Sequence, residues 1–122
     1  MVIFDTNILI EIYRGNSVVQ NEIQQIKSDT FYISSVTAAE FMAGARDKAD
    51  FQRINNHLDK YTIISINSDI SDIFIDLFKT YTLSHRPAIA DTLIAATALY
   101  HHLPLYTLNK KDFRFIPGLK LI

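Results

Sequence analysis

The amino-terminal stretch Val2-Ile3-Phe4-Asp5-Thr6-Asn7-Ile8-Leu9-Ile10 contains the pattern on which the fold prediction depends. Three apolar residues of high β propensity come first, and the polar residues 5–7 then interrupt them with groups that favour turns and helix starts. The apolar residues that follow continue as a predicted helix over 7–14. A short buried strand followed at once by a helix is the unit from which parallel sheets are built.

The same unit recurs along the chain. Further strands are predicted at Thr30–Ser34, Thr62–Ile66 and Leu105–Leu108, with Leu119–Ile122 as a candidate fifth strand after Pro117-Gly118. The helices predicted between them cover 7–14, 17–27, 36–45, 48–60, 70–83 and 91–102. This alternation predicts the α/β class, with a mostly parallel sheet of four to five strands covered by helices on both faces. Ligands of such sheets usually bind beyond the carboxyl ends of the strands.

The helix over 70–83 carries the clearest periodicity. Its apolar residues follow the spacing i, i+3, i+4, i+7, which predicts one buried stripe, and they are Ile70, Ile73, Phe74, Leu77, Phe78 and Tyr81. We expect Asp69 or Ser71 to cap the start of this helix.

Composition limits the class of protein. The 122 residues predict a single domain over 1–122, and 48% hydrophobic with 20% charged residues indicates a globular chain. The absence of cysteine excludes disulfides, zinc–thiolate sites and thiol nucleophiles. A net charge of −1 argues against an obligate sequence-independent nucleic-acid binder, but not against an enzyme that contacts nucleic acid locally. With no apolar run long enough for a bilayer and no signal peptide, we expect a cytoplasmic protein without membrane contact.

Two acidic side chains lie where a sheet of this class places its site. Asp5 ends the first strand, where it either contributes to a site or only caps the helix that follows. Glu40 shares a helix face with Val36 and Ala43, and small neighbours let another element approach it closely. The alternatives for Glu40 are an ion pair with a basic residue and a place at the margin of the apolar stripe.

Two further polar groups lie near the carboxyl-terminal strands. Asp91 shares a helix face with Ala95 and Ala98, and it either lines a site or serves as the N-cap. After the strand at 105–108, Asn109 and Asp112 flank two lysines, a pattern that is also typical of a solvated turn.

If these acids converge, they form a cluster of oxygen ligands. Two carboxylates about 4 Å apart repel by about 4 kcal/mol at an effective dielectric constant of about 20. Such a cluster therefore requires a divalent cation or shared protons, and hard ions such as Mg²⁺ or Mn²⁺ suit carboxylate ligands. These ions generate a hydroxide nucleophile and neutralise the charge of an in-line phosphoryl displacement. The predicted chemistry is hydrolysis of phosphodiesters.

Four segments, in order along the chain, resemble the motifs of PIN-domain ribonucleases. They are Asp5-Thr6-Asn7, 37–44 around Glu40, 89–96 around Asp91, and 105–113. The match extends from Val2 to Phe115, and the chain is similar in particular to the VapC-type toxins of prokaryotic type II toxin–antitoxin modules.

The resemblance implies an α/β/α sandwich, Mg²⁺- or Mn²⁺-dependent endonucleolytic cleavage of RNA, a homodimer and a cognate antitoxin. It assigns Asp5 and Asp91 as the principal metal ligands, and Glu40 completes the acidic site directly or by orienting a water. We expect Asp112 to be the fourth acid, with Asn109 as a neutral neighbour.

The same resemblance implies that Thr6 and Thr107 support the acids through hydroxyl hydrogen bonds. Positive charge is concentrated nearby, because residues 109–122 contain four basic residues against one acid. These side chains, together with Arg86, either position phosphates or are ordinary solvated surface. The four histidines show no zinc-ligand pattern, and we expect them at the surface or at helix ends; they are His57, His85, His101 and His102.

Alternatives remain open at this point. The first two helices carry apolar residues beyond one thin stripe, which indicates core, a homodimer interface or a groove for a partner helix. The chain could be a PIN nuclease without an antitoxin, acting in RNA processing or on DNA, or a catalytically inactive binding scaffold. A phosphoryl-transfer domain with Asp5 as covalent acceptor is a further alternative.

Overall fold

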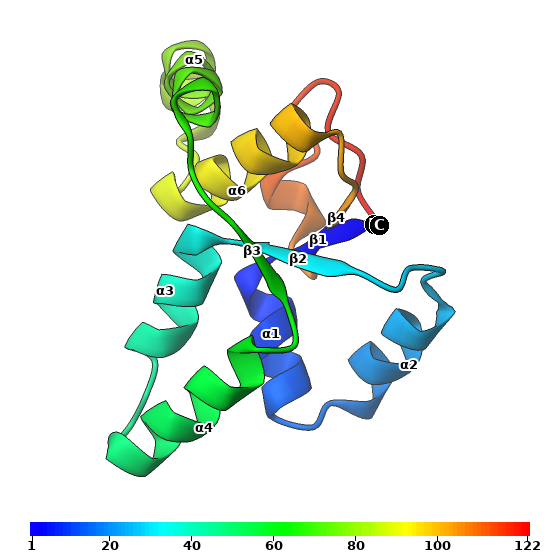
Figure 1. Cartoon of the computed structure of the whole chain (residues 1–122). Helices are drawn as coiled ribbons and strands as arrows, with labels where there is room; N and C mark the ends of the chain where they lie inside the picture. Colours follow the sequence, from blue (N-terminus) through cyan, green and yellow to red (C-terminus); the bar gives the residue numbers. More distant parts are fainter.

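A computed structural model describes all 122 residues, and a four-stranded parallel sheet lies at its centre (Figure 1). The strands are β1 (Val2–Phe4), β2 (Phe31–Ser34), β3 (Thr62–Ile64) and β4 (Leu105–Tyr106). Their order in the sheet is β3-β2-β1-β4, and every neighbouring pair is parallel. The predicted α/β class and parallel sheet are confirmed.

The candidate fifth strand is reduced to a single bridge. Leu121 pairs in parallel with Leu105 of β4, and the backbone N–H of Ile122 donates to the carbonyl of Leu105 at 2.9 Å. The N–H of Leu119 still donates to the carbonyl of Ile116 in the preceding turn, at 3.4 Å. Because that turn occupies the first residue of the predicted strand, only a short segment can pair with the sheet.

Helices cover both faces of the sheet. They are α1 (Thr6–Tyr13), α2 (Ser17–Gln25), α3 (Ser35–Ala43), α4 (Lys48–Leu58), α5 (Ser68–His85) and α6 (Ile89–His101), with a short 3-10 turn over Lys110–Asp112. In Figure 1, α1, α2 and α4 lie on one side of the sheet, and α6 lies on the other with α5 beyond it. The predicted α/β/α sandwich is therefore confirmed. No helix combines the length and the apolarity needed to cross a bilayer.

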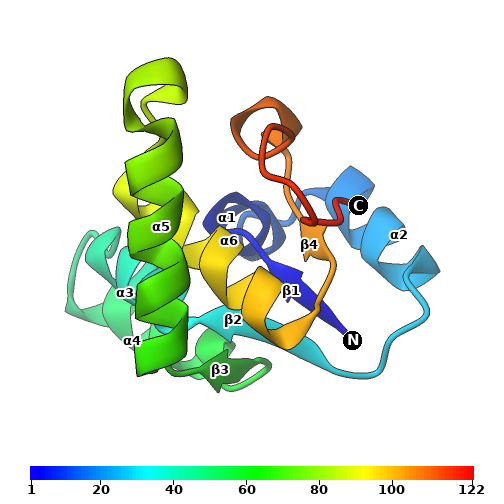
Figure 2. The same cartoon turned by 90° about the horizontal axis from the view of Figure 1, so that it is seen from above.

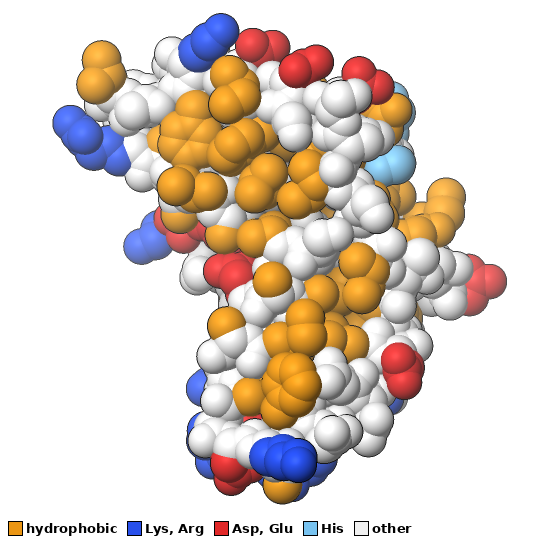
Figure 3. All heavy atoms as spheres, turned by 60° about the vertical axis from the view of Figure 1, so that its left-hand side comes forward, with side chains coloured by type: hydrophobic (Ala, Val, Ile, Leu, Met, Phe, Trp, Pro, Cys, Tyr) orange, Lys and Arg blue, Asp and Glu red, His pale blue; other side chains and the backbone are white.

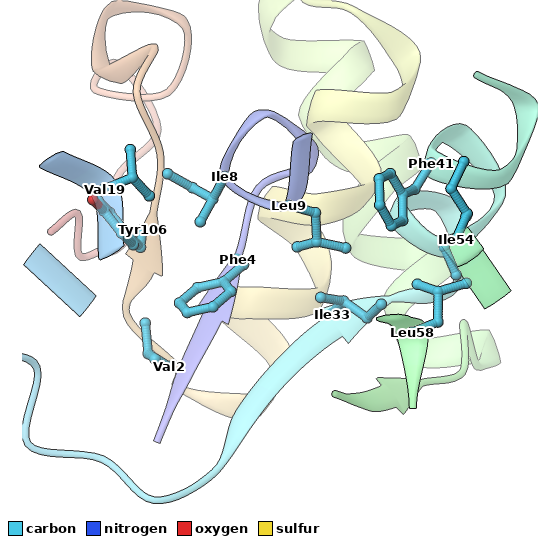
Figure 4. Packing of buried hydrophobic residues seen from close by; sticks show 11 residues of the cluster. Val2, Phe4, Ile8, Leu9, Val19, Ile33, Phe41, Ile54, Leu58 and Tyr106 are labelled. Atoms are coloured by element: carbon cyan, nitrogen blue, oxygen red, sulfur yellow. The ribbon is translucent and has the colours of Figure 1, made fainter. Parts of the chain in front are cut away.

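Alternation along β1 creates one hydrophobic core on each face. Val2 and Phe4 pack into a cluster with residues of the first four helices, whereas Ile3 packs against residues of α6 and the carboxyl-terminal segment. Phe4 lies at the centre of the first cluster (Figure 4), where its ring stacks on Phe31 with centroids 5.0 Å apart. Tyr106 meets the same ring edge-on at 5.8 Å. This packing fixes the ends of β1 and β4 relative to each other.

Helix α5 differs from the prediction. Its N-cap is Asn67, whose side-chain oxygen accepts from the N–H of Ile70 at 2.8 Å, so the expected caps Asp69 and Ser71 are wrong. Of the predicted buried stripe only Ile70 is buried, and the rest is half-buried. The reason is visible in Figure 2: α5 runs along the outside of α6, and no second layer covers its other faces.

One of the four histidines is buried at the end of a helix. His57, in the last turn of α4, is only 9% exposed and packs among the rings of Tyr13, Phe41 and Tyr61. Its Nε2 lies 2.9 Å from the Tyr61 hydroxyl. Burial and the nearby charge of Lys60 lower the pKa of His57. The expected helix-end position is confirmed, and the side chain is buried there because its ring completes an aromatic cluster between α1, α3 and α4.

Candidate active site

The carboxyl ends of β1 and β4 meet at one edge of the sheet, and Asp5 lies there. Its side chain is almost fully buried, at 4% exposure. One carboxylate oxygen accepts from the N–H of Thr6 at 2.8 Å, and the other accepts from the hydroxyl of Thr107 at 2.7 Å. Asp5 thus caps α1, as one of its two alternatives predicts, and its contribution to a site stays a prediction.

Thr107 holds this carboxylate in one orientation. It follows β4, is fully buried, and its hydroxyl oxygen accepts from the N–H of Asn109 at 3.0 Å while its proton goes to Asp5. The N–H of Asp5 in turn donates to the carbonyl of Tyr106 at 2.9 Å. The predicted hydroxyl support by Thr107 is therefore present in the structure.

Glu40 reaches the same edge from α3. The Thr6 hydroxyl donates to its carboxylate at 2.7 Å and lies 3.2 Å from the Thr37 hydroxyl. Since a carboxylate only accepts, Thr6 uses its proton on Glu40, and Thr37 then donates to Thr6. Glu40 is exposed and makes no ion pair, so the alternative of a lysine or arginine partner is wrong.

Asp91 lies in the first turn of α6. The helix begins at Ile89 with Ala88 in the N-cap position, so the alternative of Asp91 as N-cap is wrong. Its helix-face neighbours Ala95 and Ala98 are fully buried, which places this half-buried carboxylate against close packing. Burial, followed by the negative charges of Asp5, Asp112 and Glu40, raises the pKa of Asp91 to about 6.

Asp112 completes the group from the 3-10 turn after β4. Its side chain is exposed, yet its charge raises the pKa of both Asp5 and Asp91, although burial is the largest cause for each. Asp91 and Asp112 line one hollow of about 250 Å³. Asn109, the other residue considered for this position, contributes a backbone N–H to Thr107. The charges of Glu40 and Asp112 thus raise the pKa values of both Asp5 and Asp91, and the charge of Asp5 also raises that of Asp91.

None of these acids has a cationic partner. The three ion pairs of the protein join Arg14 to Glu11 and Arg46 and Arg53 to Asp50, and none of them includes one of the four acids. Arg14 and Arg46 line a pocket together with Glu40 but form no ion pair with it. No three acidic or histidine side chains lie close enough together to hold a metal ion as they stand. Mg²⁺ nevertheless keeps several waters and often binds through one or two carboxylates with substrate phosphates. Asp5 is buried and has no ion-pair partner, and Asp91 experiences repulsion from the charge of Asp5. These two carboxylates therefore fit such an ion.

The predicted basic rim is divided among separate hollows. Arg86 and Lys111 line the hollow that contains Asp91 and Asp112. Lys110 lines a different pocket, which also contains Thr107. Lys120 lies in a third hollow with residues from the end of α6 and none of the acids. Arg86 and Lys111 thus lie beside two of the predicted acids, and the phosphate contact considered for them stays a prediction.

Sequence reasoning assigned no role to two features of this edge. Thr37 lies three residues before Glu40 on α3, and that helical spacing was an available signal for its place in the hydroxyl chain. Tyr106 donates a hydrogen bond to Glu22 across 84 residues, and no local pattern indicates such a contact.

The chain is similar to known proteins over nearly its whole length. A family profile described as PIN domain matches residues 2–118. The chain is 30% identical to ribonuclease VapC10 of Mycobacterium tuberculosis over 98% of this chain and 91% of that protein. It is 28% identical to ribonuclease VapC1 of Methanocaldococcus jannaschii, with coverage of 98% and 85%.

Solved structures show the same likeness. A toxin–antitoxin complex from Klebsiella pneumoniae contains a chain with a TM-score of 0.84 and 33% identity, covering 100% of this chain and 96% of its own. VapBC-1 from nontypeable Haemophilus influenzae gives a TM-score of 0.86 at 24% identity, covering 100% and 97%, which bears on the fold alone. With the profile matched from 2 to 118 and relatives matched over nearly their full length, the chain belongs to the PIN domain family and is similar throughout to VapC ribonucleases.

Proposed function

We propose that this protein is a Mg²⁺- or Mn²⁺-dependent endoribonuclease and the toxin of a toxin–antitoxin pair. The observation that carries the proposal is the convergence of Asp5, Glu40, Asp91 and Asp112 without any cationic side chain among their partners. Unpaired carboxylates repel, and a divalent cation is the natural counter-charge. The names of the VapC relatives support RNA as the substrate. We propose the cytoplasm as the place of this activity.

Each acid has a distinct environment, and we assign roles accordingly. Asp5 is held by Thr6 and Thr107, so it presents a fixed carboxylate as a principal ligand, with Asp91 as the second. Glu40, oriented by Thr6 but open to solvent, positions the attacking water. Asp112 adds negative charge from the 3-10 turn after β4, in the hollow that it shares with Asp91. When bound, the divalent ion supplies Lewis acidity toward the phosphate and lowers the pKa of a water.

The substrate would be held by the basic side chains beside the acids. Arg86 and Lys111 share the hollow with Asp91 and Asp112, so a phosphate group there meets both cations and carboxylates. Phosphate contacts of this kind position a nucleic acid without reading its sequence. Because the whole chain is nearly neutral, we assign the binding of phosphates to Arg86 and Lys111 and not to the surface as a whole.

An antitoxin is the partner that we propose for the apolar groove between α1, α2 and α4. The groove has a volume of about 390 Å³, and its apolar lining is Phe4, Ile12, Ile23, Phe31 and Tyr61. The similar chain from Klebsiella pneumoniae comes from a toxin–antitoxin complex, which supports a protein segment as the occupant. An amphipathic helix fits a groove of this character.

We further propose a homodimer formed through α5. The stripe along this helix is only half-buried, and Ile66, Ile75 and Leu83 add exposed apolar surface at 37%, 48% and 84%. Figure 3 shows hydrophobic side chains gathered over the upper part of the face where α5 lies. Contiguous apolar surface of this kind marks an interface. An Ile75→Glu variant tests it by sedimentation, since the charge on this exposed residue would shift a dimer to monomers.

The test of the activity is cleavage of a mixed RNA pool by the purified protein. Wild type, Asp5→Asn and Asp91→Asn are compared with Mg²⁺, with Mn²⁺ and with EDTA. We expect cuts that require the ion and vanish in both variants, while Asp29→Asn, at an exposed acid with no hydrogen bond or ion pair, cuts like wild type.

Other results identify the alternatives. Equal cleavage by all variants would mean a contaminating nuclease. Binding of RNA without cleavage under any ion would favour a scaffold, and transfer of radiolabelled phosphate to Asp5 that persists in Glu40→Gln would favour the phosphoryl-transfer alternative.

A further inference from the structure

A pocket of about 500 Å³ lies between α2 and β4, beside the carboxylate group but outside it; we call it the base pocket. Its lining residues are Glu22, Gln25, Ile26, Tyr106, Thr107, Leu108, Lys110 and Ile122. The volume is in the range of about 300–1,000 Å³ that small-molecule sites occupy. Thr107 connects the two places, because this residue lines the base pocket while its hydroxyl holds Asp5 at 2.7 Å.

One wall of the pocket is rigid. Figure 4 shows Tyr106 reaching from β4 toward α2, beside Val19, and its ring is 3% exposed. The Tyr106 hydroxyl donates to Oε2 of Glu22, which fixes the position of this carboxylate. The hydrogen bond joins elements that are 84 residues apart, so the wall belongs to the tertiary structure and not to a flexible local turn.

The polar groups of the pocket are left with free bonding capacity. Glu22 makes no ion pair and no second hydrogen bond, so its Oε1 can still accept. The Gln25 amide and the Lys110 ammonium have no side-chain partner within the protein either. Three polar groups with free hydrogen-bonding capacity therefore surround an apolar lining made by Ile26, Leu108 and Ile122.

This combination selects one kind of ligand. A fixed carboxylate repels a phosphate, and a single lysine does not suit a cation, so neither simple ion matches the pocket. A nucleobase has flat apolar faces and an edge of N–H donors and carbonyl acceptors, which are the partners that carboxylate, amide and ammonium groups recognise. A carboxylate accepts from the amino group of adenine, cytosine or guanine. Uracil has no amino group. Its one donor on the Watson–Crick edge, N3–H, lies between two carbonyl oxygens that repel a carboxylate, so uracil binds Glu22 less well.

We propose that the base pocket binds a nucleobase next to the scissile phosphodiester and that Glu22 selects bases with an amino group against uracil. This proposal rests on the proposed ribonuclease function and adds a determinant of its sequence preference. Gln25 binds the same base edge through its amide, and Lys110 binds a carbonyl oxygen or the adjoining phosphate. Tyr106 is a positioning residue, since it acts by orienting Glu22.

The first test measures nucleotide binding without cleavage. Backbone amide shifts of the protein in EDTA are followed by NMR during titration with AMP, CMP, GMP and UMP. We expect shifts at Gln25, Thr107 and Leu108 with each amino-bearing nucleotide, and about tenfold weaker binding of UMP. Glu22→Gln keeps an acceptor for Tyr106, so the fold is retained, and it should reduce the difference to less than about twofold. Equal binding of all four nucleotides to wild type, or shifts confined to other regions, would overturn the proposal.

The second test uses cleavage. Short RNAs that differ only in the bases on either side of the cut are compared by kcat/KM with wild type, Glu22→Gln and the charge-matched control Asp29→Asn. Wild type and the control should disfavour uracil by about tenfold at one position, and Glu22→Gln should lose that preference. An unchanged preference in Glu22→Gln would refute the base pocket while leaving the nuclease intact. Nucleotide binding at the pocket without any RNA cleavage would instead support the pocket and refute the proposed function.

Discussion

The hydroxyl of Thr107 donates to the carboxylate of Asp5 at 2.7 Å and thereby joins the ends of β4 and β1, which are 102 residues apart in sequence. Both side chains are buried. Burial raises the pKa of Asp5, and the hydrogen bond from Thr107 opposes that rise. The threonine therefore favours the ionised form of Asp5, which is the form that binds a cation.

Thr107→Val should impair RNA cleavage while leaving the fold in place. Valine keeps the shape of threonine, but Asp5 loses its donor and the N–H of Asn109 loses its acceptor. Loss of a residue that orients a metal ligand typically lowers metal affinity or activity about 10–100-fold. Mg²⁺-dependence curves of cleavage measure this effect. Thr107→Ser is the matched control, and equal loss in both variants would contradict the role of the hydroxyl.

Asp91 should make the metal-free protein less stable as pH rises. Its folded-state pKa of about 6 lies above the ordinary value of 3.8, so the native state holds an extra proton between these values. Stability therefore declines as pH increases through this window. In EDTA at pH 7.5 we expect the free energy of unfolding of Asp91→Asn to exceed that of wild type by about 1 kcal/mol. This figure is discounted for solvent screening because the side chain is half-exposed. Urea unfolding at pH 4 and pH 7.5 measures it, and a difference that is the same at both pH values would contradict the assignment.

His57 should have the opposite pH dependence. Burial lowers its pKa in the folded state below the ordinary 6.5, so the unfolded chain takes up the proton more readily. The stability that depends on neutral His57 is complete above pH 6.5 and is lost as pH falls through the lowered pKa. His57→Phe keeps an aromatic ring beside Tyr13 and Phe41 and should flatten this acid-side loss. Urea unfolding between pH 7.5 and pH 5 measures this effect in Asp91→Asn, a background that removes the titration of Asp91, with and without His57→Phe. Parallel curves of unfolding free energy against pH for the two proteins would refute the prediction.

Variants at two helix C-caps distinguish an effect on stability from an effect on substrate binding. Arg86 after α5 and His102 after α6 both have left-handed backbones, with φ of 44° and 54°. A residue with a side chain has a steric cost of about 1 kcal/mol in this backbone conformation, and glycine removes that cost. The gain in stability is reduced because glycine also gives the unfolded chain more conformational freedom. His102→Gly should gain stability and cleave RNA normally. Arg86→Gly should gain similar stability but bind RNA more weakly, with a shallower salt dependence, because it loses a cation beside Asp91. Undiminished RNA binding by Arg86→Gly would exclude Arg86 from substrate contact.

Local sequence determined the elements and the candidate acids. The run from Val2 to Ile10 predicts a strand and a helix because β propensity and helical spacing act over a few residues. Strand-by-helix alternation then implies a parallel sheet, and parallel strands bring their carboxyl ends to one edge. That argument was enough to predict Asp5 at the sheet edge, and the ordered motifs added Glu40, Asp91 and Asp112.

Only the tertiary structure decided how these residues are paired and covered. Whether Glu40 meets an arginine or the Thr6 hydroxyl, whether His57 is buried, and whether the stripe of α5 is covered all depend on which elements lie beside them. The contact between Glu22 and Tyr106 joins residues that no local pattern relates. Sequence fixes propensities because they are local free energies, whereas partners across the sheet are selected by the packing of the whole chain.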